Sequence, residues 1–549
     1  MNRELHLGRR HHARLAQALL VTSLFLYSGS LHLNAQEFSP RPKSSSSLRT
    51  SEEQIVEGPI VLDHEEAHKC PVQGASDQGR YIFGYSFDSS FIYDRESKEY
   101  TIPEAGTRVV YVWDNGDALV FVNQQSGGIL PKGSTEIKTF VSPRTDFPNV
   151  GPIYASSNGK YIVANISAGG YQILPAIIMR TDAGLYVTKE LIAPAEDILG
   201  GEAQYSQARF CSEDGSVIYG VQVDWQGMFH RLVRWVRDGE GNYRFEGLLD
   251  DLFFNLQAPK PGPAPAEQDY ITIPNTDPKY EEQVAAYNKA SKEWGQKVLA
   301  RTKTVSFFSK KMQCSSDGQF ICAAVREAND DEAYTREYPL IYDLRKAEAH
   351  ILRDMESYSS VDVWGGKYLL CFSGTPPRGA SSVWSLEKRE SQDFLRWLSD
   401  RCGRDLKKDF SYEIVDELTG ETKQISSPGY PTLSRGGRVM TFYGLGASEG
   451  DNARNTYLVF KEPFGTFIET IQPGQEALFA GYSSATRTLH TAIPDCLVSV
   501  YDALGALCHQ SKSNAEGACQ LPESLTAGAY IVKLSHLTKG NSSVKLYMR

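Results

Sequence analysis

Seven segments of the chain share one alternation of polar and apolar residues. Each begins with small or polar residues, passes through a tight turn that contains glycine, and ends in a hydrophobic run of strand length. Asp-Gly, Asn-Gly and Gly-Gly at the turn supply the positive φ angles that two-residue hairpin turns require. The segments are SDQGRYIFGY (76–85), WDNGDALVFV (113–122), SSNGKYIVAN (156–165), SEDGSVIYGV (212–221), SSDGQFICAA (315–324), VWGGKYLLCF (363–372) and LSRGGRVMTF (433–442).

Several segments are followed by a second apolar run, such as FIYDRES (91–97) and PLIYDLRK (339–346). One strand, a glycine turn, a second strand and one or two further strands make a four-stranded antiparallel blade. Such a sheet buries both of its faces only by packing against copies of itself. Four of the six spacings between turn glycines lie between 37 and 56 residues, near the length of one blade, and spacings of 103 and 71 residues indicate insertions. We therefore predict an all-β fold in which residues 56–468 form a seven-bladed β-propeller, with six or eight blades as alternatives.

The repeated phrase resembles the β-propeller repeats of the TolB-like and dipeptidyl-peptidase N-terminal type. The resemblance covers roughly residues 60–465, and no α/β-hydrolase domain follows it. It implies that the Asp-Gly turn joins the first two strands of a blade and that the loops between the second and third strands open on the opposite face. We expect EGPIVLD (57–63) to be a strand that closes the ring by joining the last blade.

Two insertions, near 252–304 and 387–425, carry helical patterns. In the first, we expect Asp277 to cap a helix with Pro278 in its first turn. Its stripe of residues at helical spacing is Val284, Tyr287, Ser291, Trp294 and Val298. In the second, SQDFLRWLSDRC (391–402) has the same kind of spacing. The helices either project over a ligand site on the loop-bearing face or pack on the propeller rim.

An acidic run, REANDDEAYTRE (326–337), offers oxygen ligands for calcium but lacks the spacing and turn glycine of an EF-hand loop. The alternative is a solvated acidic loop. With the aromatic residues of the insertions, it completes the predicted binding surface. The candidate binding residues are Tyr287, Trp294, Asp330, Asp331, Phe394 and Trp397.

The first 35 residues are typical of a secretory signal peptide, with four arginines, a short apolar run and Ala35 at the expected cleavage site. Its removal takes away four arginines and one glutamate, so the net charge changes from −10 to −13. This acidic balance disfavours a nucleic-acid partner. We expect a flexible segment over 36–55 and no transmembrane segment in the mature chain, which is exported to the cell surface, the outer membrane or the medium.

A second domain is predicted over 470–549, where short alternating strands broken by glycine suggest a small β-sandwich. Its phrases VSVYDALGALC, LTAGAYIVKL and VKLYMR resemble, in this order, the C-terminal sorting domain of the Bacteroidetes type IX secretion system. By that resemblance Gly528 and Tyr530 fall on the G-x-Y motif and Lys545 on the terminal motif, although the usual Pro-Asn-Pro opening is missing. The resemblance implies type IX machinery as a partner and release or attachment to surface lipopolysaccharide.

The stretch DHEEAHKC (63–70) contains H-E-x-x-H, in which His64 and His68 would bind zinc and Glu65 would act as general base. Pro71 follows too closely for a long active-site helix, and few other histidines could supply a third ligand. We therefore predict no cofactor and a non-enzymatic module that binds protein, peptide or glycan. The alternative is a secreted hydrolase, such as a zinc metallopeptidase using His64, Glu65 and His68.

Overall fold

The computed structural model describes residues 55–548 with gaps. The gaps are 87–88, 124, 169–172, 225–229, 317, 329–334, 345, 356–357, 365, 374–379, 404, 408, 416–421, 427–429, 445–453, 462–478, 484–485, 503–506, 523, 526–527 and 537–539. The predicted signal peptide and nearly all of the predicted segment 36–55 therefore lie outside the described residues, as do Asp330 and Asp331. The chain folds into two compact units, one up to Pro463 and one from Phe464 onwards.

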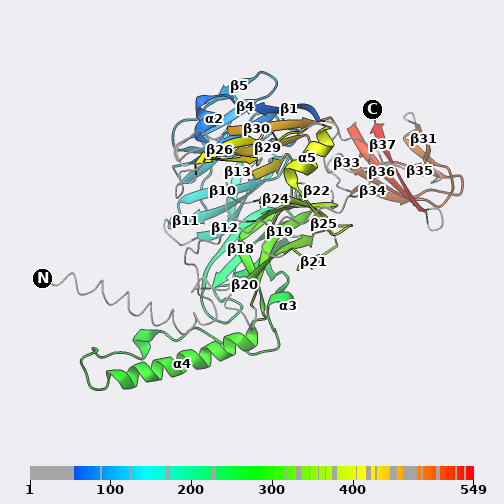
Figure 1. Cartoon of the computed structure of the whole chain (residues 1–549). Coiled ribbons are helices and arrows are strands. Elements are labelled where there is room, and N and C mark those ends of the chain that lie inside the picture. Colours follow the sequence, from blue (N-terminus) through cyan, green and yellow to red (C-terminus); the bar gives the residue numbers. More distant parts are fainter. Residues whose placement is uncertain are drawn as a thin grey trace. The chain divides into compact units, whose positions relative to one another are not determined.

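The first unit contains seven four-stranded antiparallel blades, one for each repeat, and two of them, blades 2 and 3, are joined in one eight-stranded sheet. Figure 1 shows the arrangement of the strands. The first strands of neighbouring blades contact one another from blade 7 through blade 1 to blade 6, so these strands line the inside of the ring. The strands of blades 1 to 3 are β2 (Val72–Ala75), β3 (Tyr81–Tyr85), β4 (Ser90–Asp94) and β5 (Glu99–Thr101); β6 (Thr107–Val112), β7 (Ala118–Val122), β8 (Ser126–Leu130) and β9 (Lys138–Thr139); and β10 (Asn149–Ala155), β11 (Tyr161–Ser167), β12 (Ile173–Arg180) and β13 (Tyr186–Glu190).

Blades 4 to 6 repeat this order, and a single parallel pair between Ser126 and Val150 links blades 2 and 3. Their strands are β14 (Ala203–Cys211), β15 (Val217–Asp224), β16 (His230–Arg237) and β17 (Tyr243–Gly247); β18 (Val305–Cys314), β19 (Phe320–Ala328), β20 (Thr335–Asp343) and β21 (Glu348–Ile351); and β22 (Ser359–Trp364), β23 (Tyr368–Ser373), β24 (Ala380–Ser385) and β25 (Glu390–Asp393).

Blade 7 combines both ends of the first unit. It contains β28 (Tyr430–Leu433), β29 (Val439–Gly444) and β30 (Arg454–Phe460), and its fourth strand is β1 (Ile55–Val61), which pairs antiparallel with β30. The predictions of seven blades and of a closing strand are both confirmed. The first unit is a seven-bladed β-propeller in which the N-terminal strand completes the last blade.

The backbone angles of the turn glycines explain why the repeat can be recognised in the sequence. All seven, from Gly79 to Gly437, have φ between +62° and +91°, where residues with a Cβ are strained. The serine that opens five of these turns accepts a hydrogen bond from the main chain five residues later, as Ser212 does from Val217 at 3.0 Å. Glycine therefore supplies the backbone angle, and serine joins the turn to the following strand.

The first insertion folds mainly on itself. It contains α3 (Asp250–Phe253), the 3₁₀ turn η1 (Glu267–Asp269) and α4 (Tyr280–Arg301), which extends away from the blades in Figure 1. The predicted cap is wrong in detail, because α4 begins after Lys279 and the Asp277 carboxylate instead accepts a hydrogen bond from the Lys279 main chain at 2.9 Å.

The second insertion begins later than predicted, because residues 390–393 form the last strand of blade 6. Helix α5 (Phe394–Cys402) follows, and the Asp393 carboxylate caps it by accepting a hydrogen bond from the Arg396 main chain at 2.9 Å. A hairpin of β26 (Ser411–Val415) and β27 (Thr422–Ser426) comes next. Among the helices in the described part of the chain, none combines the length and apolar character that a membrane span needs.

The second unit consists of two sheets around its own core, as expected for a small β-sandwich. One sheet contains β31 (Phe479–Ser483), β32 (Thr488–Thr491) and β35 (Ala518–Gln520), and the other contains β33 (Leu497–Asp502), β34 (Leu507–Lys512), β36 (Gly528–His536) and β37 (Gly540–Met548). Cys519 is buried in the first sheet and Cys508 is exposed in the second, and the two are not cross-linked.

Candidate functional site

The HEEAH stretch forms the link between the closing strand and blade 1. Helix α2 (Glu65–Lys69) is only five residues long, and His64 lies before it in an extended conformation as its N-cap. The Nδ1 atom of His64 accepts a hydrogen bond from the Glu66 main chain at 3.1 Å, and its ring stacks on Tyr100 with centroids 4.3 Å apart. The first histidine therefore performs a structural task.

The other two residues of the motif are also engaged. Glu65 forms an ion pair with Lys69 at 2.8 Å, and His68 lies 3.4 Å from the carboxylate of Asp63. Among the described residues, no group of three or more His, Cys, Asp or Glu side chains is arranged to hold a metal ion. The alternative zinc site of His64, Glu65 and His68 is therefore not assembled in this geometry.

Asn455 on β30 fixes this link to the last blade. Its side chain is fully buried, its Oδ1 accepts a hydrogen bond from the Val72 main chain at 2.9 Å, and its Nδ2 donates to the carbonyls of Ala67 and Cys70 at 2.5 and 2.7 Å. One amide thus connects the last blade to α2 and to the start of blade 1. No sequence pattern indicates this role, because Asn455 is separated from its partners by more than 380 residues.

Several of the predicted binding residues are buried, which corrects that prediction. Tyr287 is 7% exposed and packs near Tyr270, while Trp294 is partly buried and donates its indole N–H to the Gly262 carbonyl at 3.0 Å. The apolar stripe of α4 therefore covers the extended part of its own insertion, which leaves Tyr287 unable to serve as a contact surface.

Helix α5 also buries its aromatic residues, in this case against the propeller. Phe394 is fully buried, and its ring centroid lies 6.2 Å from that of Phe442 in blade 7. Trp397 is 6% exposed and stacks on Trp364 of blade 6, with ring centroids 5.7 Å apart. The alternative in which the helix packs on the propeller is therefore the observed one for α5. Helical spacing of apolar residues identified the buried face of each helix and not a binding face.

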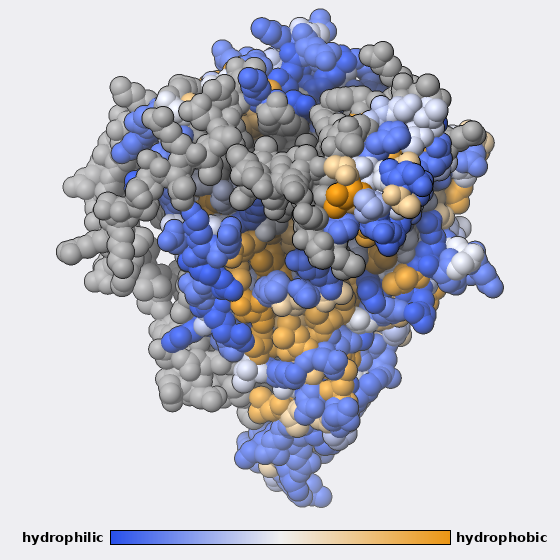
Figure 2. Space-filling model, turned by 90° about the vertical axis from the view of Figure 1, so that its right-hand side faces the viewer, coloured by the Kyte–Doolittle hydropathy of each residue, from blue (hydrophilic) through white to orange (hydrophobic). Residues whose placement is uncertain are grey.

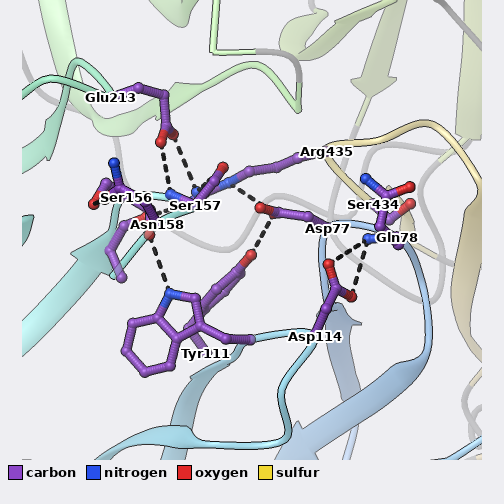
Figure 3. A network of polar contacts seen from close by, with 12 residues as sticks. Asp77, Gln78, Tyr111, Asp114, Ser156, Ser157, Asn158, Glu213, Ser434 and Arg435 are labelled. Atoms are coloured by element: carbon purple, nitrogen blue, oxygen red, sulfur yellow. Dashed lines mark hydrogen bonds and ion pairs between the residues drawn. The ribbon is translucent and has the colours of Figure 1, made fainter. Parts of the chain in front are cut away.

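A polar network that spans several blades lies at the turns between first and second strands. Arg435, in the turn of blade 7, extends to the turn region of blades 3 and 4 (Figure 3). Its Nη1 lies 3.2 Å from Ser157 Oγ and 3.3 Å from Glu213 Oε1, and its Nη2 donates to the Ala155 carbonyl at 2.5 Å. A single side chain thus joins blade 7 to blades on the far side of the ring.

Blades 1 and 2 complete the surroundings of this guanidinium. Arg435 Nε lies 3.8 Å from Asp77 Oδ1, and Asp77 in turn accepts a hydrogen bond from the Tyr111 hydroxyl. The guanidinium also lies over the rings of Tyr111 and Tyr154, at 4.8 and 4.6 Å from their centroids. Five blades therefore meet at one cation.

The electrostatics of the network favour this charge. Burial acts to lower the pKa of Arg435, but Tyr154, Tyr111, Asp77 and Glu213 outweigh it and raise that pKa above its ordinary value. Burial raises the pKa of the Tyr111 hydroxyl, so this group stays protonated and donates to Asp77. The network is therefore structural, because its guanidinium, its carboxylates and the Tyr111 hydroxyl bind one another across blades.

Carboxylates also join neighbouring turns. The main-chain N–H of Gln78 donates to Asp114 of the next blade, that of Ser157 to Glu213, and that of Ser316 to Asp362. These acceptors and Arg435 belong to or adjoin the turn segments that the sequence had identified by glycine alone. The residue that follows the turn-opening residue could have been compared across the repeats. At the described positions it is serine, aspartate or glutamate except in blade 7, where it is Arg435.

The known proteins that resemble the chain do so only distantly. No family model matches the chain, and no curated protein matches it. Similar solved structures include an oligogalacturonate lyase in complex with manganese (8% identity, 71% of this chain and 88% of that chain, TM-score 0.37) and TolB from Acinetobacter baumannii (12%, 59% and 62%, 0.28). Prolyl oligopeptidase B from Galerina marginata bound to a 35mer substrate is also similar (10%, 68% and 45%, 0.36).

These neighbours are β-propeller proteins, but TM-scores below 0.5 carry no argument about what this chain does. The class follows from the strand pairing of the chain itself. It is an all-β protein with a seven-bladed propeller, closed at blade 7 by its N-terminal strand, and a separate two-sheet unit at its C-terminal end.

Proposed function

We propose that the chain is an exported, non-enzymatic binding protein in which the propeller recognises a protein, peptide or glycan. The proposal rests on the observation that the H-E-x-x-H residues make structural contacts. His64 caps a helix and stacks on Tyr100, and Glu65 forms an ion pair with Lys69. Figure 2 adds an apolar area, drawn in orange and bordered by polar residues, of the kind that binding surfaces use.

Metal content and peptidase activity test this proposal. We expect the purified protein to contain zinc well below one ion per chain and to cleave no peptide library. We also expect His68→Ala to leave both readouts unchanged, with Glu136→Ala as a surface control far along the chain. Stoichiometric zinc that disappears in His68→Ala would overturn the binding assignment and restore the peptidase alternative.

We further propose that the C-terminal unit directs export through type IX secretion machinery to the cell surface or medium. Support comes from the sorting-domain phrases, from the independent core of this unit and from the burial of Tyr530, the tyrosine of the G-x-Y motif, at 7% exposure. Gly528 begins β36, and Lys545 on β37 pairs in register with Ile531. The motif residues therefore belong to the central and terminal strands of one sheet.

A reporter fusion tests the export proposal. A fluorescent protein placed between residues 1–35 and 464–549 is expected to leave a bacterium that has type IX machinery, and mass spectrometry of the native mature chain is expected to find Gln36 at its N-terminus. Removal of 540–549, which contains β37, is expected to retain the reporter in the periplasm. Equal secretion with and without these ten residues would contradict the proposal.

A further inference from the structure

The inner strands of the propeller share an irregularity. In β2, β6, β10, β14 and β22, one extra residue interrupts the register with the second strand, three positions before the residue that opens the turn. Such a β-bulge changes the direction of one side chain relative to the two faces of the sheet. The extra residues are Gln73, Val110, Ile153, Arg209 and Val361.

The position of the bulge indicates where these side chains point. In β14, Ala208 belongs to the core shared by blades 3 and 4, whereas Phe210 belongs to the core shared by blades 4 and 5. Residue 209, between them, belongs to neither core. Strand β14 is the innermost strand of its blade: one of its edges pairs with β15, and the other faces the inside of the ring. The direction left for the Arg209 side chain is therefore toward the axis of the propeller.

Not every residue at this position faces the axis. Met312 and Pro431 occupy the same position in blades 5 and 7 but are buried, Met312 in the core shared by blades 4 and 5, and Val110 packs against the core of blades 1 to 3. Gln73, Ile153, Arg209 and Val361 are partly exposed and belong to none of these cores, as residues along an axial opening would be. Arg209 is therefore the charged member of a layer that also contains two apolar residues and one amide.

One nitrogen of Arg209 lacks a hydrogen-bond partner. Its Nε atom is buried, and within the described part of the chain no carboxylate, carbonyl or hydroxyl accepts a hydrogen bond from it. Burial lowers the pKa of this guanidinium, and Tyr205 opposes that effect only in part. Arg209 is thus a partly exposed guanidinium with one buried N–H that has no partner, in contrast with Arg435, whose nitrogens bind a hydroxyl, a carboxylate and a carbonyl.

We propose that Arg209 binds the carboxylate of a ligand at the propeller axis, with the apolar residues of its layer contacting the body of that ligand. A planar guanidinium pairs with a carboxylate through two parallel hydrogen bonds. Because the Arg435 network occupies the turn side of the ring, the ligand enters from the opposite face. This inference rests on the proposed binding function and names the chemistry that the propeller would recognise.

Calorimetric titration of the mature full-length protein tests the site with three probes. N-acetyl-phenylalanine carries a carboxylate on an apolar body, N-acetyl-phenylalaninamide lacks the charge, and glucuronate carries a carboxylate on a polar body. We expect the acid to bind at least about tenfold more tightly than its amide, because a charge-assisted pair is lost in the amide. We also expect the acid to bind more tightly than glucuronate, because Ile153 and Val361 offer an apolar surface beside Arg209.

The variant Arg209→Gln is expected to remove the preference for the acid over the amide, while Arg209→Lys retains part of it. Arg234→Gln is the matched control, since Arg234 lies in the same blade but pairs with Glu246, and it should keep the full preference. Circular dichroism should show that Arg209→Gln is folded and no less stable, because no ion pair is lost.

Wild-type protein that does not distinguish acid from amide, or Arg209→Gln that binds the acid as wild type does, would overturn this site. Equal binding of glucuronate and N-acetyl-phenylalanine would overturn the apolar part of the proposal. Failure here is distinguishable from failure of the binding function, because the zinc and peptidase measurements do not depend on Arg209.

Discussion

At the scale of single residues, the turn glycines differ in what surrounds them. A Cβ added at Gly215 would lie 2.3 Å from the ring of Tyr161, whereas at Gly318 no heavy atom of the described residues lies within 4 Å. Both have positive φ, +62° and +70°. Two costs that usually occur together, backbone strain and overpacking, are therefore separable in this chain.

We predict that Gly318→Ala lowers the free energy of unfolding by about 1–2 kcal/mol, the cost of a left-handed residue with a Cβ. Gly215→Ala should cost a further 1–3 kcal/mol or so, because Tyr161 must move in a packed core. Urea denaturation of both variants checks the difference. Equal losses would mean that the contact between the turn of blade 4 and blade 3 is not tight.

The sequence could predict the turns at this scale but not the two arginines. Glycine and asparagine or aspartate carry a local signal, since they fulfil a backbone requirement within four residues. Arg435 and Arg209 have no such signal, because the partners of Arg435 lie in other blades and the role of Arg209 depends on a bulge. Aligning the seven turns would have singled out Arg435 without revealing its partners, whereas Arg209 differs from its equivalents only once the strands and their bulges are known.

At the scale of elements, α2 is held mainly by the last blade. Asn455 satisfies three main-chain groups around α2, while His64 supplies one cap and one ring contact. We predict that Asn455→Ala lowers the free energy of unfolding by about 3 kcal/mol or more, because buried N–H and C=O groups lose their partners.

The matched variant is His64→Ala, for which we expect a loss of about 1 kcal/mol, the usual value of an N-cap. Thermal denaturation followed by circular dichroism compares the two. A larger loss for His64→Ala than for Asn455→Ala would show that the motif, and not the amide, fixes this link.

Element boundaries were less predictable than element types. Both inserted helices exist, but α4 begins after Lys279, and the residues before Phe394 belong to blade 6. Periodicity located the apolar stripes of these helices correctly. It could not tell what the stripes would face, and Tyr287, Phe394 and Trp397 prove to be buried against the protein itself.

At the scale of the whole molecule, two devices complete the ring. Strand β1 supplies the outer strand of blade 7, and Arg435 joins that blade to blades 1 to 4 at the turns. Radial closure leaves few unpaired strand edges, which lets sheets with two apolar faces exist in solution. The binding proposal assumes that this ring is closed.

Cross-linking of β1 to β30 tests ring closure most directly. Glu57 and Val459 are partners in register although 402 positions separate them in the sequence, so cysteines at both positions should be close enough to bond. We predict that Glu57→Cys/Val459→Cys forms a disulfide under mild oxidation, seen by mass spectrometry as one linked peptide, and that neither single variant forms it. Two free thiols in the folded double variant would contradict the closed seven-bladed ring.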